Sequence, residues 1–127
     1  MFQGCSNTRR STNAEHFNFD VFFGRSGGFS NMNPVFEIKS NGEVLRGDHA
    51  KSPLIILKKL ENSKIDSLYY LINQCNFGSL SIKQVSNITY YIELKSDKVN
   101  NKVTWFDESQ IPLEVRRLHQ FLMQLIK

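Results

Sequence analysis

Strict alternation of apolar and polar residues, in two separate stretches, is the feature that most limits the fold of this 127-residue chain. The first stretch is FNFDVFFG, residues 17–24, and the second is SNITYYIELKS, residues 86–96. A period of two residues is that of a β-strand with one buried face, so both stretches are predicted strands. The residues expected to point inward are Phe17, Phe19, Val21, Phe23, Ile88, Tyr90, Ile92 and Leu94.

Two shorter alternating segments surround the dipeptide Asn41-Gly42. PVFEIKS, residues 34–40, precedes it, and EVLR, residues 43–46, follows it. Asn-Gly between two such segments predicts a hairpin with a type I′ turn, in which both central residues need a positive φ. These segments add two antiparallel strands to the predicted sheet.

Two further segments leave alternatives open. LIILKKL, residues 54–60, is short and β-branched, which favours a strand, but its leucine spacing also fits the start of a helix. KVTWFDE, residues 102–108, follows the polar turn DKVNN and is predicted to pair with the strand before that turn. Its inward residues are either Val103 and Trp105 or their neighbours Thr104 and Phe106.

Two amphipathic helices are predicted from apolar residues three or four apart. The first follows Ser63, an expected N-cap with Asp66 in the capping-box position. It is terminated by Asn76-Phe77-Gly78, in which Gly78 is expected to adopt the left-handed conformation. The second begins at Pro112. The inner faces are Ile65, Leu68, Tyr69, Ile72 and Cys75 in the first helix, and Val115, Leu118, Phe121, Leu122, Leu125 and Ile126 in the second.

These elements define the fold class as α+β, with an antiparallel sheet of four to six strands and two helices packed on one face. Residues 17–127 form one domain of this kind. Residues 1–16 contain no periodic apolar positions and are predicted to be a flexible leader.

The charged and metal-binding residue types exclude several function classes. The net charge of +4 is spread over small clusters, so we expect a basic solvated surface and no nucleic-acid partner. The three histidines lie too far apart in sequence to form a zinc motif. No run of 18 apolar residues occurs, so no segment is expected to span a membrane.

No catalytic constellation is evident in the sequence. Ser26 and Ser30 lack the G-x-S-x-G frame of a nucleophile elbow, and the glycines beside them lack the spacing of a phosphate-binding loop. The carboxylates Asp20, Glu37, Glu43 and Asp107 are scattered in sequence and expected to be solvated. We therefore expect a non-enzymatic protein with no catalytic residue, no cofactor and no metal.

Cys5 lies in a context similar to the end of a bacterial lipoprotein signal. A bulky apolar residue, Phe2, stands three positions before it, and a small one, Gly4, stands just before it. Acylation of Cys5 would make residues 1–16 a membrane tether and place the domain in the cell envelope, periplasmic or surface-facing. The alternative is an ordinary disordered N-terminus with an incidental cysteine, in a cytoplasmic protein. One acyl chain binds a membrane only marginally.

The stretch RSGGFSN, residues 25–31, is the candidate partner-binding segment. It follows a phenylalanine-rich strand, and its two glycines let the backbone approach another surface closely. Phe29 is an aromatic residue of the kind that anchors interfaces, and Arg25 can pair with carboxylates. The alternative is a plain turn with Phe29 directed inward. The candidate residues are Arg25, Ser26, Gly27, Gly28, Phe29, Ser30 and Asn31.

Four segments together resemble the emfourin family of small inhibitors of thermolysin-like zinc metallopeptidases of the protealysin kind. They are RSGGFS at the end of the first strand, CNFGSL at the helix exit, VTWFDE, and IPLEVRRLHQFLMQLI in the last helix. The resemblance covers residues 17–127 in the order of elements. It implies occlusion of a protease cleft by preformed loops, including the segment Arg25 to Asn31.

A lipid-anchored structural or assembly protein of the cell envelope is the alternative function. Its contact residues would be those that the periodicity places off the core stripes, namely Phe22, Tyr70 and Tyr91. Neither the target protease nor the oligomeric state follows from the sequence.

Overall fold

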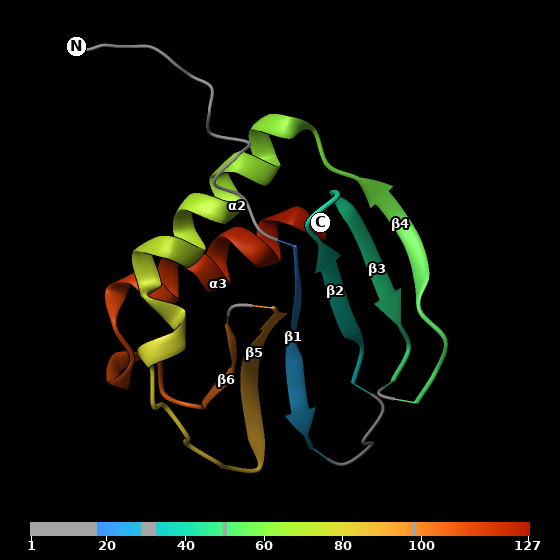
Figure 1. Cartoon of the computed structure of the whole chain (residues 1–127). Coiled ribbons are helices and arrows are strands. Elements are labelled where there is room, and N and C mark those ends of the chain that lie inside the picture. The colour runs from blue at the N-terminus through green and yellow to red at the C-terminus, as the bar shows by residue number, and fades with distance from the viewer. Residues whose placement is uncertain (1–17, 29–32, 50, 98) are drawn as a thin grey trace, which may run out of the picture.

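A computed structural model describes residues 18–28, 33–49, 51–97 and 99–127. These residues form one six-stranded sheet in the order β4-β3-β2-β1-β5-β6, and all neighbouring strands in it are antiparallel. Figure 1 shows helices α2 and α3 lying together on one face of this sheet. The predicted α+β class, with two helices on one face, is therefore confirmed.

The strands follow the predicted alternation, with shifted ends, except that Ile88, which was predicted to point inward, is exposed. Phe17 and the predicted leader, residues 1–16, lie outside the described residues. The bounds of the strands are β1 Phe19–Gly27, β2 Val35–Lys39, β3 Glu43–Gly47, β4 Ile55–Lys59, β5 Ile88–Ser96 and β6 Asn100–Trp105. The ambiguous segment 54–60 thus contains a strand. Val103 and Trp105 of β6 face the core, and Thr104 and Phe106 do not.

The β2–β3 hairpin exists as predicted, but its turn type was predicted wrongly. The backbone N–H of Gly42 donates to the Lys39 carbonyl at 2.9 Å, so Ser40 and Asn41 are the central residues. Gly42 has a φ of 99°, whereas Asn41 is not among the described residues with a positive φ. Gly42 therefore closes a three-residue loop, where glycine is typical in the left-handed position.

The helices are α2, Asn62–Cys75, and α3, Leu113–Leu125. Ser63 lies inside α2, and Glu61 is the N-cap residue, so the predicted capping box is wrong. The left-handed residue after α2 is Asn76, with a φ of 49°, and not Gly78. Gly78 lies within the short 3₁₀ helix η2, Phe77–Ser79. Asparagine tolerates this conformation better than most side chains.

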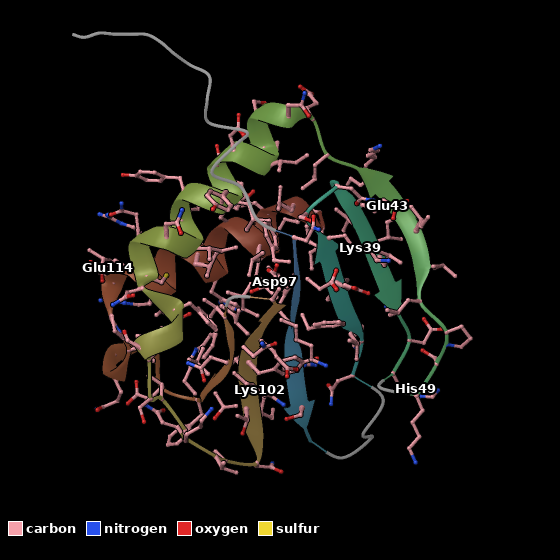
Figure 2. All side chains as sticks on the ribbon, viewed as in Figure 1. Lys39, Glu43, His49, Asp97, Lys102 and Glu114 are labelled. Atoms are coloured by element: carbon pink, nitrogen blue, oxygen red, sulfur yellow. The ribbon has the colours of Figure 1, made fainter. Side chains whose placement is uncertain are left out.

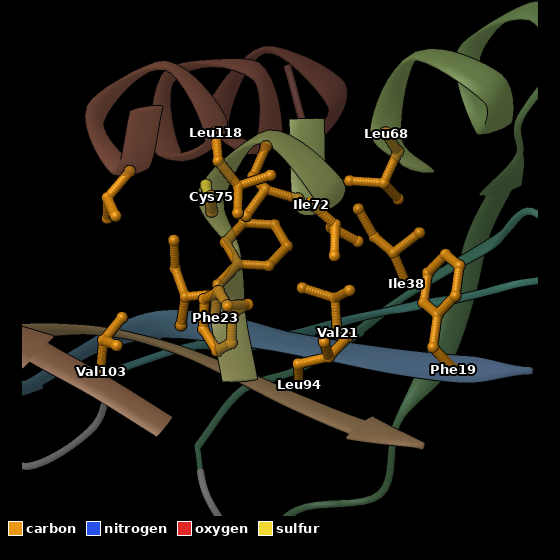
Figure 3. Close-up of a cluster of buried hydrophobic side chains, with 14 of the residues drawn as sticks. Phe19, Val21, Phe23, Ile38, Leu68, Ile72, Cys75, Leu94, Val103 and Leu118 are labelled. Carbon is orange, nitrogen blue, oxygen red and sulfur yellow. The ribbon is translucent and has the colours of Figure 1, made fainter. Parts of the chain in front are cut away.

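The core lies between the sheet and the two helices, as Figure 3 shows. Side chains of the central strands β1 and β5 meet those of α2 and α3 there. The predicted inner faces of both helices are confirmed. Their buried residues include Leu68, Ile72 and Cys75 in α2, and Val115, Leu118, Leu122 and Leu125 in α3. The fully buried core residues of largest volume are Trp105, Phe23, Ile38, Leu68, Ile92, Leu94, Leu118 and Leu122.

Phe23 and its neighbour Phe22 differ because they point to opposite faces of β1. Phe23 is fully buried and stacks on Phe36 of β2 with ring centroids 5.4 Å apart, whereas Phe22 is only half-buried. Phe23→Ala is therefore expected to lower the free energy of unfolding by about 3 to 5 kcal/mol. Phe22→Ala, the matched control, should cost about 1 kcal/mol. Urea unfolding measures both values, and equal losses would contradict this division of the two faces.

Candidate binding site

The predicted segment 25–31 is divided between the end of β1 and the residues that follow it. Arg25, Ser26 and Gly27 continue β1 and pair with Tyr90, Thr89 and Ile88 of β5. The sequence interpretation ended this strand at Gly24, which was wrong. The long partner strand β5 supplies backbone hydrogen bonds beyond that glycine. Phe29, Ser30 and Asn31 lie outside the described residues, as does Cys5.

Gly27 is fixed by its neighbours and has no room for a side chain. Its φ is 97°, and a Cβ atom there would lie 1.8 Å from the carbonyl oxygen of Asn87. The next N–H, that of Gly28, donates to the same Asn87 oxygen at 3.0 Å. The two glycines therefore allow a close contact between the end of β1 and the chain that leads into β5.

Asn33 connects the two sides of the segment. Its Nδ2 donates to the carbonyl oxygen of Gly27 at 2.8 Å, and its Oδ1 accepts from Nε of Arg25 at 3.2 Å. The sequence interpretation did not single out Asn33. Its side chain joins the point where the chain leaves β1 to the point where it returns towards β2. The ends of the segment 28–33 are thus held in place by hydrogen bonds.

The same residues border a cavity on the face of the sheet away from the helices, which we call the open face. The cavity has a volume of about 510 Å³. Alternation along paired strands puts Phe22 and Tyr91 on this face, and Arg25, Ser26, Gly27 and Asn33 form one end of the cavity. The remaining lining residues are Val35, Ser52, Leu54, Glu93 and Lys102.

Charged side chains lie next to the aromatic rings of the open face. Nζ of Lys102 lies 4.9 Å from the ring centroid of Tyr91, and Nζ of Lys95 lies 5.1 Å from that of Phe22. Such cation–π contacts hold lysine side chains over the rings. Burial, followed by the charge of Glu93, raises the pKa of the Tyr91 phenol. The cavity thus combines apolar surface with both signs of charge, from Glu93 and from Arg25 and Lys102.

Phe22 and Tyr91, two of the three contact residues expected for an envelope protein, thus lie together in this cavity. Tyr70 does not join them. It is exposed on α2, on the helix-covered side of the sheet. A surface made of all three residues therefore does not exist.

One predicted carboxylate is not solvated. Glu37 of β2 lies on the open face and is only 6% exposed. Burial, and after it the charge and hydrogen bond of the Asp20 side chain, raises the pKa of the Glu37 carboxyl above its ordinary 4.5. Lys39 and Lys95 act in the opposite direction but are smaller effects. The sequence reasoning missed this pair because Asp20 and Glu37 meet only through the β1–β2 register.

The carboxylates and histidines of the described chain are otherwise dispersed. Figure 2 shows Glu43, Asp97, Glu114 and His49 standing well apart. Among the described residues, no three His, Cys, Asp or Glu side chains gather into a group that could hold a metal ion. No helix in the described part of the chain is long and apolar enough to cross a membrane.

Comparison with known proteins does not assign the chain to a family. No family model matches it. The phenylalanine–tRNA ligase beta subunit of Coxiella burnetii (strain RSA 493 / Nine Mile phase I) is 29% identical over 85 residues. That match covers 61% of this chain and 11% of the ligase subunit. The chain thus spans about a tenth of the length of that protein.

Glu37→Gln is expected to raise protein stability at neutral pH. A raised carboxyl pKa means that folding favours the neutral form, so the free energy of unfolding falls as the pH rises above 4.5 and through the folded-state pKa. Glutamine stays neutral and keeps a hydrogen-bonding group for Asp20. The melting temperature of Glu37→Gln should therefore exceed that of the wild type at pH 7 and approach it at pH 4.

The control for this comparison is Asp48→Asn, which removes one exposed carboxylate outside the helices and strands. Thermal unfolding at both pH values compares the three proteins. An identical pH profile for Glu37→Gln and Asp48→Asn would assign the effect to overall charge and contradict a special role of the Glu37 environment.

Proposed function

We propose that this chain is a non-catalytic protein-binding domain that inhibits a thermolysin-like zinc metallopeptidase. The loop that follows β1 would enter the active-site cleft of the protease and block access of substrate. The class of target comes from the resemblance of residues 17–127 to the emfourin family. The family assignment itself stays a prediction.

The observation that carries the proposal is the hydrogen-bonded base of the loop. Asn33 ties Arg25 to Gly27, and Gly28 is bonded to Asn87, so both ends of the loop are fixed on the sheet. A loop whose ends are fixed has less conformational entropy to lose on binding than one whose ends are free, which favours tighter association. Arg25 and Ser26 are exposed at this base and accessible to a partner.

Arg25 supplies a positive charge at the base of the loop, where acidic groups of the protease cleft could pair with it. Asn33, which accepts a hydrogen bond from Arg25, limits the conformations of the guanidinium group. The adjoining cavity, with Phe22 and Tyr91, would receive side chains from the rim of the cleft. Only Arg25 and the loop itself are assigned to the cleft.

Acylation of Cys5 and a place in the cell envelope stay predictions, because Cys5 lies outside the described residues. Mass spectrometry of the chain purified from its native membrane and soluble fractions tests them. An acylated protein would be compatible with inhibition at the cell surface. An acylated protein without inhibitory activity would favour the alternative function, a structural or assembly role in the envelope.

Arg25→Ala is expected to weaken inhibition by at least about tenfold, a loss of roughly 1.4 kcal/mol of binding free energy. Because Arg25 is exposed, the melting temperature should stay nearly unchanged. The measurement is the inhibition constant against protealysin and thermolysin with a peptide substrate.

Arg117→Ala is the matched control, since Arg117 is an exposed arginine on α3, away from the loop. It should inhibit as the wild type does. Equal weakening by both variants would indicate a general charge effect. Failure of the wild-type chain to inhibit either protease would contradict the proposed function.

A further inference from the structure

The edge strand β4 presents unpaired backbone and apolar side chains to solvent. It pairs with β3 on one side and forms one end of the sheet, at the outer margin of the molecule in Figure 1. All five of its residues are exposed. Ile55 is 64% exposed, Ile56 59% and Leu57 43%, so three consecutive large apolar residues face water. An open edge of this kind is a template for pairing with another strand.

The opposite end of the sheet is covered by the chain itself. The N–H of Thr104 in β6 donates to the carbonyl of Ile82 at 3.0 Å, and the N–H of Gln84 donates to the carbonyl of Thr104 at 2.9 Å. Lys83 forms the corresponding parallel bridge with Thr104. The segment Ile82 to Gln84 therefore occupies part of the outer edge of β6. The two ends of the sheet differ, because no described segment of the chain pairs with the outer edge of β4 in this way.

We propose that two copies of this chain associate through their β4 strands, antiparallel and about a two-fold axis at Ile56. In that register Ile56 of one copy lies opposite Ile56 of the other, and Ile55 lies opposite Leu57. Ile56 then contacts Ile56 on one face of the joined sheet, and Ile55 contacts Leu57 on the other face. The antiparallel order of the sheet continues from one copy into the next. A strand paired with its own symmetry mate makes the self-complementary contact that a two-fold dimer requires.

The charges of β4 also fit this register. Lys58 and Lys59 follow the apolar triplet, so the two-fold axis sends the lysines of the two copies to opposite ends of the joined strands. Lys58 of each copy lies opposite Leu54 of the other. The two Lys58 positions are then four residues apart along the strands, or about 13 Å. That exceeds the Debye length of about 8 Å at physiological salt, so their repulsion is largely screened.

The assembly is limited to two copies because pairing occupies the β4 edge of both. The covered edge of β6 gives a third copy no equivalent site among the described residues. Five-residue strands bury less than the roughly 1,200 Å² of a small stable interface, so association should depend on concentration in the micromolar to millimolar range. β3 and β2 separate β4 from β1, so the dimer leaves the proposed inhibitory loop accessible.

Sedimentation velocity of the full chain over a thousandfold range of concentration tests the proposal. We expect the wild type to shift from monomer to dimer as concentration rises. Ile56→Lys should remain a monomer throughout, because each dimer would place two charges at the two-fold axis. Val85→Lys, at a residue that is 80% exposed and away from β4, should dimerise as the wild type does.

Melting temperatures establish that both lysine variants are folded. A wild-type chain that stays monomeric at the highest concentration would overturn the proposal. So would a dimer that Ile56→Lys leaves intact, because its interface would then lie elsewhere.

A cross-link tests the register in a chain carrying Cys5→Ser. Burial, followed by the charge of Glu114, raises the pKa of the Cys75 thiol to about 11, so the native Cys75 should react little. Ile56→Cys is expected to form an intermolecular disulfide under mild oxidation, because side chains directly opposite in an antiparallel pair lie within bonding reach. Val85→Cys should cross-link far less. Equal cross-linking of the two variants would contradict the two-fold axis at Ile56.

Discussion

Burial of the inward face of β1 and β5 beneath the helices is the interaction on which the other features of this protein depend. These two central strands are nine residues long and pair along their whole length. Phe23, Ile92 and Leu94 on their inner face are at most 1% exposed. Because side chains alternate along a strand, fixing this face also fixes which residues face away from the helices.

The candidate binding site is a direct result of that constraint. Phe22 and Tyr91 are directed to the open face because Phe23 and Ile92, beside them in sequence, are packed inside. The same two strands run on past the core to the pairs Arg25–Tyr90, Ser26–Thr89 and Gly27–Ile88. The base of the proposed inhibitory loop is therefore anchored to the most strongly paired part of the sheet, and its position depends little on the loop's own residues.

The sequence predicted those parts of the fold that depend on local periodicity. Alternation identified β1 and β5, and the apolar stripes identified the inner faces of α2 and α3. It failed where the outcome depends on long-range pairing. The extension of β1 through Arg25 to Gly27 requires β5 as a partner, and burial of Glu37 requires the β1–β2 register. The end of α2 after Cys75 was predicted, but its caps were not: the N-cap residue is Glu61 and not Ser63, and the left-handed residue is Asn76 and not Gly78. Serine and glycine have stronger general preferences for these positions than the residues that occupy them.

The environment of Trp105 has a practical consequence for studying this molecule. It is the chain's single tryptophan, fully buried, with its indole ring edge-on to His119 at a centroid distance of 5.0 Å. Its intrinsic fluorescence is thus an optical signal for loss of the interior, and a ligand that only touches the outside should leave the emission maximum in place. Unfolding can therefore be followed in the unlabelled chain in the presence of any ligand that contains no tryptophan, without confusing binding with unfolding.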